Sequence, residues 1–346
     1  MQKVTIIGKY NMLTIAADGQ SVKTRIVTQE LEKIIGIDQI RKIDTCGWKK
    51  NPLKLFARSF IAVQKSDNVV FMTDAGGIKV FPWLLLGANI FHKSSLHYVV
   101  VGAWLVKYLE KHKFISACLK RFRAIYVETL VLKNGLENLG FNNVYLMANF
   151  KQLSVLSEKH LVFNTEPYKF CTFSRVMEEK GIAEAVEAVQ EVNNHYGRTV
   201  CMLDIYGQVD PDQVEWFENL RKEFPPGVQY CGLIPYEKSV EVIKNYFAVL
   251  FPTKFYTEGI PGTIIDAYAA GVPVIASRWE SFEEVIEVGK TGLGYNFEEP
   301  ENLKSILLEL VESPEIIYSM KKNCLVSATR YLPESSMDVL ISKLSL

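Results

Sequence analysis

The sequence has 346 residues, which is long for one domain and sufficient for two domains of ordinary size. Hydrophobic residues make up 48% and charged residues 23%, a balance that excludes a disordered chain. The net charge is zero, but residues 1–150 carry 21 Lys and Arg against 10 Asp and Glu, so the rest of the chain has the opposite surplus. This split predicts two separate units with different partners.

The chain shows no sign of secretion or of a membrane span. Its start, MQKVTIIGK, lacks the layout of a signal peptide, and no run approaches the ~20 apolar residues that a membrane helix needs. The six cysteines form no CxxC pair, and Cys171, Cys201 and Cys231 lie in apolar runs. We therefore expect buried free thiols, no metal site and a cytoplasmic location.

Short apolar runs alternate with amphipathic stretches in the first half of the chain. Buried strands are predicted at residues 4–8, 69–73, 96–101 and 143–147, and helices at 20–35, 52–63 and 103–123. Strand–helix alternation of this kind is typical of a parallel sheet with helices on both faces.

The second half repeats the pattern. Its predicted strands are residues 168–173, 199–206, 228–231, 248–251 and 272–276, and a helix follows the first of them. We therefore expect an α/β protein with two doubly wound, Rossmann-like domains, residues 1–165 and 166–331. The last segment, 332–346, is expected to pack back on the first domain.

The segment from Phe251 to Ala276 carries the strongest functional signal, because ligands of parallel α/β domains bind at the carboxyl ends of strands. It predicts a strand, a loop with Glu258, and a helix from Gly262 to about Ala270 that contains Asp266. Thr263 is expected to cap the helix, whose N-terminus favours an anion such as a diphosphate. Both carboxylates are expected to accept hydrogen bonds from hydroxyl groups in one pocket.

A second segment, Phe173-Ser174-Arg175-Val-Met-Glu-Glu-Lys180-Gly181, follows the first strand of the second domain. Arg175 and Lys180 are two cations at a strand's carboxyl end, in the half of the chain with surplus negative charge. This placement indicates recruitment for a phosphate group.

The two segments together resemble the family-four retaining glycosyltransferases, of the kind found in bacterial capsule and exopolysaccharide synthesis. That family has a G-R-x4-K-G loop, here with Ser174 in place of the glycine. It also has two Glu residues separated by seven positions, here Glu258 and Asp266. The run Ala-Tyr-Ala-Ala-Gly271-Val-Pro273-Val-Ile-Ala is similar to the family's as well. The resemblance implies the GT-B fold, in which two Rossmann-like domains face each other across a cleft.

The resemblance also implies roles for individual residues. Arg175 and Lys180 would hold the diphosphate of a nucleotide sugar such as a UDP-sugar, Glu258 the hydroxyls of its sugar, and Asp266 its ribose. No metal or other cofactor is implied. The further donor contacts implied are backbone groups of Gly19, Gly232, Ile234, Gly259, Ile260, Gly262 and Thr263.

Several weaker patterns are given their ordinary interpretation. His97 falls several residues before the position of the family's histidine and is expected to be structural. Asp210-Pro-Asp212 resembles a D-x-D metal motif, but Asp and Pro are ordinary residues at a helix start. Two alternatives to transfer stay open: a non-catalytic sugar- or partner-binding protein, and an isomerase or phosphorylase of the same fold.

The acceptor is expected on the basic first domain. The stretch 107–123 mixes cations with Leu, Phe and Ile, and Lys49, Lys50, Lys54 and Arg58 lie near Trp48, Leu55 and Phe56. Such a surface is typical of attachment to an anionic membrane, and a solvated basic helix is the alternative. We expect a glycan or lipid-linked oligosaccharide acceptor, location in the cytoplasm or on the inner face of the plasma membrane, and no nucleic acid.

Overall fold

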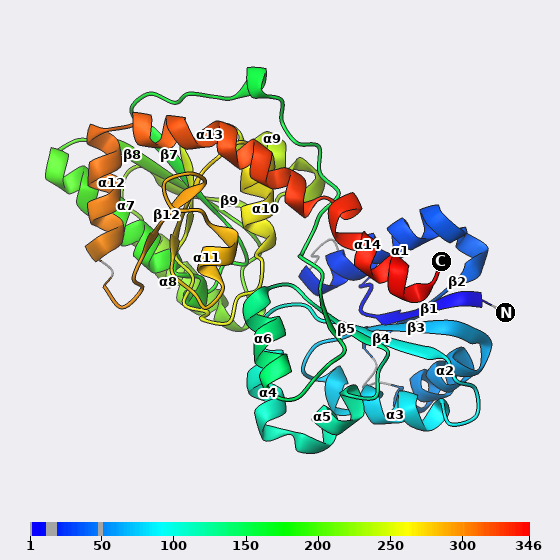
Figure 1. Ribbon diagram of the computed structural model, residues 1–346. Coiled ribbons are helices and arrows are strands. Elements are labelled where there is room, and N and C mark those ends of the chain that lie inside the picture. Colours follow the sequence, from blue (N-terminus) through cyan, green and yellow to red (C-terminus); the bar gives the residue numbers. More distant parts are fainter. Residues whose placement is uncertain (1, 12–18, 48–50, 300) are drawn as a thin grey trace. The chain divides into compact units, whose positions relative to one another are not determined.

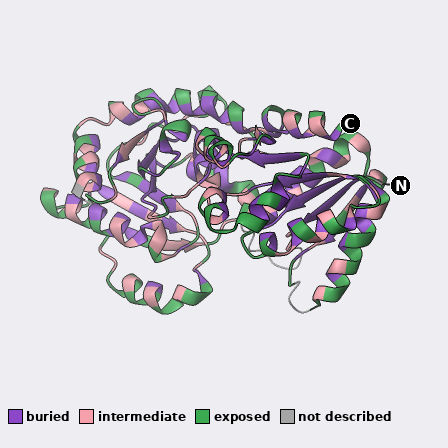
Figure 2. Ribbon diagram, turned by 60° about the horizontal axis from the view of Figure 1, so that its bottom comes forward, coloured by how far each residue is buried: buried purple, intermediate pink, exposed green. Residues whose placement is uncertain are grey.

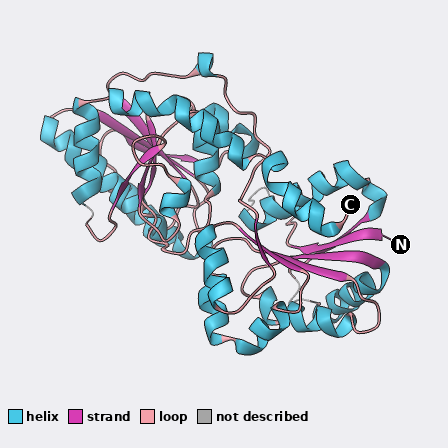
Figure 3. Ribbon diagram, viewed as in Figure 1, coloured by secondary structure: helices cyan, strands magenta, loops and turns pink. Residues whose placement is uncertain are grey.

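The computed structural model describes residues 2–11, 19–47, 51–299 and 301–346 (Figure 1). The chain divides into two compact units. The first comprises Met1–Gln152 and Tyr331–Leu346, and the second comprises Leu153–Arg330. Each unit is a parallel sheet with helices on both faces, as Figure 3 shows.

The first unit contains six parallel strands in the order β2-β1-β3-β4-β5-β6. Their bounds are β1 Gln2–Gly8, β2 Ile40–Asp44, β3 Ser66–Met72, β4 Ser95–Val99, β5 Ala124–Val127 and β6 Val144–Leu146. The helices are α1 Gly19–Ile35, α2 Pro52–Lys65, α3 Phe81–Ala88, α4 Leu105–Lys111, α5 Lys113–Leu119, α6 Leu130–Asn138 and α14 Pro333–Leu344.

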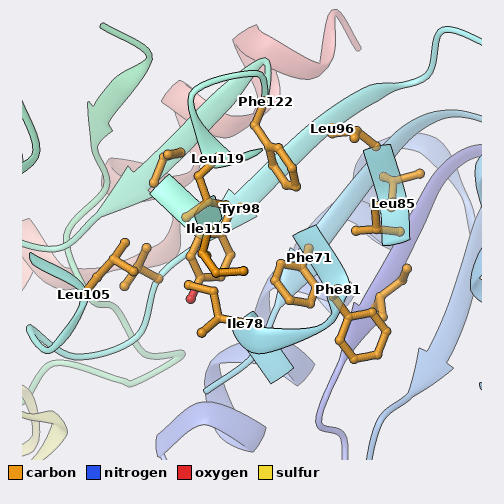
Figure 4. Close-up of a cluster of buried hydrophobic side chains, with 14 of the residues drawn as sticks. Phe71, Ile78, Phe81, Leu85, Leu96, Tyr98, Leu105, Ile115, Leu119 and Phe122 are labelled. Carbon is orange, nitrogen blue, oxygen red and sulfur yellow. The ribbon is translucent and has the colours of Figure 1, made fainter. Parts of the chain in front are cut away.

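The sheet of the first unit separates two apolar cores. Figure 4 shows the larger one, in which helices α2 to α6 pack on one face of the sheet; Phe71, Tyr98 and Phe81 are at its centre. On the opposite face, α1 and α14 lie side by side over β1, β3 and β5 (Figure 1). Met337, Leu340 and Leu344 of α14 are buried there, so the end of the chain completes the first unit.

The stretch 103–123 is not the single helix that its periodicity predicts. The helix ends at Lys111, His112 leaves helical geometry with φ −124° and ψ 69°, and α5 begins at Lys113. The ring of His112 stacks on Tyr108, and its Nδ1 lies 2.7 Å from the Tyr108 carbonyl oxygen. This local contact competes with continuation of the helix.

The second unit also has six parallel strands, in the order β12-β11-β10-β7-β8-β9. The strands are β7 Tyr168–Phe173, β8 Cys201–Tyr206, β9 Val228–Gly232, β10 Ala248–Phe251, β11 Val274–Ser277 and β12 Gly292–Tyr295. The helices are α7 Ile182–Tyr196, α8 Val214–Lys222, α9 Ser239–Ile243, α10 Gly262–Ala269, α11 Phe282–Val285, α12 Glu301–Glu312 and α13 Glu315–Ala328. Figure 2 shows the strands of both units buried beneath helices with exposed outer surfaces.

The strand order of the second unit has a functional consequence. From β7 the chain moves outward to β8 and β9, then returns to add β10, β11 and β12 on the other side of β7. The loops after β7 and β10 therefore diverge to opposite faces of the sheet. In open parallel sheets, this switch point is where a ligand enters.

The connection between the units begins earlier than the boundary expected at residue 165. The backbone N–H of Leu156 donates to the Ala269 carbonyl at 2.8 Å, and Leu161 packs against Gly271, so this segment lies on the second unit. Lys151, just before it, donates to the Tyr331 carbonyl within the first unit at 3.1 Å. The division therefore falls between Gln152 and Leu153.

Candidate active site

An ion pair joins the two loops at the switch point of the second unit. Lys180 follows β7 and Glu258 follows β10, and the Lys180 ammonium contacts Oε1 of Glu258. Thr253 Oγ1 donates to the same oxygen at 3.0 Å. Each partner keeps 17% of its side-chain surface exposed, so the pair is largely enclosed yet reachable by a ligand.

Aromatic rings and backbone contacts fix the ion pair in place. The Lys180 ammonium lies 5.4 Å from the ring centre of Phe251 and 4.9 Å from that of Phe255, distances at which a cation is attracted to a ring face. Lys254 N–H donates to the Glu179 carbonyl at 2.8 Å, which ties the two loops together. Gly181 has φ +70°, and a Cβ there would come within 1.9 Å of the Pro252 carbonyl oxygen. Glycine is therefore required where the loops meet.

A second ion pair joins the β7 loop to the β8 loop. Nη1 of Arg175 lies 3.2 Å from Oδ2 of Asp210, while 52% of the Arg175 side chain stays exposed. Asp210 also accepts from the Asp212 N–H at 3.0 Å, so it caps a short 3₁₀ helix, as its sequence context predicts. Backbone bonds between Val176 and the pair Gln208 and Asp210 align the loops. Asp210 thus holds the Arg175 guanidinium through Nη1, and the rest of the side chain stays accessible to a ligand.

Gly207 connects these loops to the turn that follows β9. Its N–H donates to the Gly232 carbonyl at 2.9 Å, and its own carbonyl accepts from the Tyr230 hydroxyl at 2.8 Å. A Cβ on Gly207 would lie 1.7 Å from the Ser174 carbonyl oxygen. The Arg175 loop and the turn with Gly232 and Ile234 are therefore held by the same residue.

Helix α10 begins at Gly262, as predicted, but Thr263 does not cap it. The cap residue is Pro261, and the Thr263 hydroxyl instead donates to the Phe173 carbonyl at the end of β7. This contact anchors the helix N-terminus at the switch point. Asp266, in the same helix, is only 2% exposed.

The other residues that the sequence predicts at the donor site lie in both units. Gly259 and Ile260 are buried beside Glu258, and Gly19 is the first residue of α1 in the first unit. A Cβ on Gly19 would meet nothing within 4 Å among the described atoms. His97 is completely buried in β4, where its Nδ1 lies 3.0 Å from the Tyr126 hydroxyl, so it is a core residue as expected.

The charged patch of the first unit is only partly as predicted. Lys54 and Arg58 are exposed on α2, but Leu55 is 5% exposed and belongs to the core. Trp48, Lys49 and Lys50 lie outside the described residues. Within the described part of the chain, no helix has the length and apolar character to cross a membrane. The same residues include no group of three His, Cys, Asp or Glu side chains placed to hold a metal ion.

Solved structures with the same architecture define the fold as GT-B. Anabaena Alr3699/HepE, in complex with UDP and glucose, aligns over 100% of both chains with a TM-score of 0.76 and 12% identity. Sucrose-phosphate synthase from Thermosynechococcus elongatus covers 100% of this chain and 98% of its own, with a TM-score of 0.79 and 15% identity. Both alignments extend over the two Rossmann-like units.

A family model is similar to most of the second unit. Residues 167–313 match the family model described as Glycosyl transferases group 1. The match includes both motif segments of the second unit, and it agrees with the resemblance that these segments carry.

Two curated proteins are similar to parts of this chain. Alpha-monoglucosyldiacylglycerol synthase of Acholeplasma laidlawii is 26% identical over 185 residues, which are 53% of this chain and 44% of that enzyme. The chain thus aligns with less than half of the synthase. The uncharacterized glycosyltransferase MJ1069 of Methanocaldococcus jannaschii is 21% identical over 75% of this chain and 70% of its own.

Proposed function

We propose that this protein is a retaining, metal-independent glycosyltransferase that moves a sugar from a UDP-sugar to a glycan acceptor. The Lys180–Glu258 pair at the switch point carries the proposal, because it places a cation and a sugar-binding carboxylate where a nucleotide sugar would bend. The group 1 family domain supports transfer, and HepE, with bound UDP and glucose, supports a UDP-sugar donor.

In this proposal, each loop contacts a different part of the donor. Gly232 and Ile234 contact the uracil and Asp266 the ribose hydroxyls. Arg175, Lys180 and the amides of Gly262 and Thr263 hold the diphosphate. Glu258, beside the amides of Gly259 and Ile260, accepts hydrogen bonds from the sugar hydroxyls.

The residues act on the charge that develops during transfer. When the bond from the sugar C1 to the phosphate oxygen breaks, UDP leaves with the electron pair and its negative charge grows. Cations and amides already aimed at that oxygen stabilise the transition state more than the ground state. The acceptor oxygen bonds to C1 from the face that UDP leaves, and its proton passes to the departing phosphate.

Calorimetric titration with UDP and GDP tests the donor site. We expect wild-type protein to bind UDP in preference to GDP. Arg175→Ala and Asp266→Ala should weaken UDP binding at least tenfold, since each removes a charged or buried polar contact. Glu258→Ala should spare UDP binding and abolish transfer from a UDP-sugar. A folded wild-type protein that binds neither nucleotide would contradict the proposal and favour a non-catalytic role.

We further propose that the acceptor is lipid-linked and that the first unit contacts an anionic membrane. Helices α2, α3 and α5 cover the same face of the sheet and expose large apolar side chains among cations. Phe91 is 88% exposed, Ile90 69% and Phe114 67%. Lys54 and Arg58 on α2, Lys93 after α3 and Lys113 on α5 are exposed near them in the sequence. A mixture of exposed aromatic and basic residues fits a membrane surface better than it fits free solvent.

Sedimentation with vesicles of anionic and neutral lipid tests this surface. Replacing Phe91 and Phe114 by Ser should reduce binding to anionic vesicles about tenfold or more, because two exposed aromatic side chains no longer enter the interface. Val326→Ser is the matched control, since Val326 is 61% exposed but lies on the second unit. Absence of wild-type binding at low salt would refute the membrane proposal and leave the donor site unaffected.

A further inference from the structure

A hollow of about 390 Å³ lies at the amino ends of the strands in the first unit. Lys3, Asp67, Asn68, Ser95 and Arg123 line it from the starts of β1, β3, β4 and β5, together with residues 343–346 at the end of α14. Parallel sheets place their ligand loops at the carboxyl ends of the strands, so this hollow belongs to the opposite edge. It is therefore separate from the glycosyltransferase chemistry proposed above.

The hollow collects positive charge. Its lining includes three cationic side chains, those of Lys3, Arg123 and Lys343, and one carboxylate side chain, that of Asp67. Among the residues that the structure describes, neither Lys3 nor Arg123 forms an ion pair. The ammonium of Lys343 lies 4.2 Å from the ring centre of Tyr145, which restrains it at the edge of the hollow. Like charges gathered without partners favour an added anion.

Arg123 is exposed and directly precedes β5, at the amino ends of the strands. Its charge acts on two buried groups, His97 and Tyr126: together with burial it lowers the pKa of His97 to about 4, and it opposes the burial-driven rise in the pKa of Tyr126. Ser95 adds a neutral hydroxyl to the lining, whereas the Asn68 amide donates to the backbone carbonyls of Lys3 and Leu344.

The wall formed by α14 is held in place by the core. Asn68 is 7% exposed, and its Nδ2 donates to the Leu344 carbonyl at 3.2 Å. Ser345 follows with φ +56°, a left-handed conformation that ends the helix at the hollow. The cations therefore come from elements that are fixed relative to one another, a requirement for specific anion binding.

We propose that this hollow is a binding site for a phosphate group, either inorganic phosphate or the phosphate of a small phosphomonoester or lipid headgroup. Arg123 supplies a fork of donors that matches two phosphate oxygens, and Lys3 and Lys343 supply point charges. The volume is within the range of small-ligand pockets and exceeds what a phosphate ion alone fills. A bound phosphate would join β1 and β5 to α14 and stabilise the return of the chain to the first unit.

Calorimetric titration of the full chain with inorganic phosphate, at constant ionic strength, tests the site. We expect saturable binding by wild-type protein, at least tenfold weaker in Arg123→Gln and weakened in Lys343→Gln. The matched control is Arg121→Gln, because Arg121 is exposed two residues away and does not line the hollow. Arg123→Lys keeps the charge without the fork and should bind with intermediate affinity. Circular dichroism confirms that each variant is folded.

A further variant distinguishes phosphate binding in the hollow from binding at the donor site. Phosphate binding here should persist in Arg175→Ala, so a failed donor site and a failed hollow give different results. No phosphate binding by the wild type, or equal losses in Arg121→Gln and Arg123→Gln, would overturn the proposal. With phosphate binding established, Arg123-dependent attachment to vesicles containing phosphatidic acid would identify a lipid headgroup as the ligand. Binding of glycerol 3-phosphate without such attachment would identify a soluble phosphomonoester.

Discussion

Gly207 lies so close to Ser174 that a methyl group on Gly207 would come within 1.7 Å of the Ser174 carbonyl oxygen. Gly207 also has φ +139°, a conformation that L-residues with a side chain rarely adopt. We therefore expect Gly207→Ala to lower the free energy of unfolding by about 1–3 kcal/mol and to displace the Arg175 loop. UDP affinity should fall about tenfold, as measured by calorimetry.

Gly197→Ala is the control for this prediction. Gly197 ends α7 with φ +61°, and a Cβ there would meet nothing within 4 Å. The substitution should therefore cost some stability through backbone strain while leaving UDP affinity unchanged. Equal losses of UDP affinity in the two variants would mean that Gly207 does not position the loop.

Asp210→Asn should weaken the hold on Arg175 without breaking the helix cap, because an asparagine oxygen still accepts from the Asp212 N–H. The Arg175–Asp210 pair is partly exposed, so it contributes at most about 1 kcal/mol to holding the loop in place. We expect the KM for the donor to rise about two- to fivefold with little change in kcat. Asp212→Asn serves as the control in the same steady-state assay, and an equal effect there would argue against a role for the pair.

Lys321 is a buried cation whose removal should stabilise the second unit. It is completely buried in α13, its Nζ lies 3.4 Å from the Tyr246 carbonyl oxygen, and burial lowers its pKa to about 8. Lys321→Met keeps the apolar stem and should raise the free energy of unfolding by up to about 3 kcal/mol at pH 7.

The advantage of the Lys321→Met variant should shrink at high pH. Between pH 8 and about 10.4, the unfolded chain keeps the proton on Lys321 while the folded chain releases it, so wild-type stability rises with pH relative to the variant. Denaturation in urea at pH 7, 8, 9 and 10 measures this difference. A constant difference across that range would contradict the assignment.

His97 should make the first unit sensitive to acid. Burial, with a smaller contribution from Arg123, lowers the pKa of His97 to about 4, and its Nε2 has no hydrogen-bond partner among the described residues. Between pH 6.5 and 4, the unfolded chain binds the proton first, so stability is lost as the pH falls through this range. The loss from this group amounts to up to about 3 kcal/mol.

Denaturation profiles from pH 7 to 4 test His97 by comparison with two variants. His97→Gln should be less stable at pH 7, since it disturbs the contact with Tyr126, but its stability should decline less on acidification. His112→Gln, which changes an exposed histidine, should keep the wild-type slope. Parallel profiles for wild type and His97→Gln would show that His97 does not titrate in this range.

Periodicity was sufficient to predict most strands but not those without an apolar run of their own. Strand β12 reads Gly-Leu-Gly-Tyr, and its glycines are explained only by packing: a Cβ on Gly294 would lie 2.3 Å from the Phe282 ring. Strand β5, Ala124–Val127, was not predicted either, because it follows directly on the helix predicted at residues 103–123 without a turn signal between them.

The sequence predicted which segments form the candidate site, but not which of their residues form pairs. Motif spacing placed Arg175, Lys180 and Glu258 on loops after strands, which the structure confirms. Their partners depend on strand order, because β7 lies between β8 and β10. Only that order places Asp210 beside Arg175 and Thr253 beside the Lys180–Glu258 pair. The helix-start interpretation of Asp210 was correct but omitted this second role.

The return of α14 to the first unit sets an order of events during synthesis on the ribosome. The second unit, Leu153–Arg330, has all its strands as soon as it emerges, whereas the first unit waits for Met337, Leu340 and Leu344 to cover one face of its sheet. Helix α1 covers its own part of that face early, but the part under α14 has no cover while the second unit is translated. The first unit is therefore complete only after the second unit has been made, although most of its chain is made first.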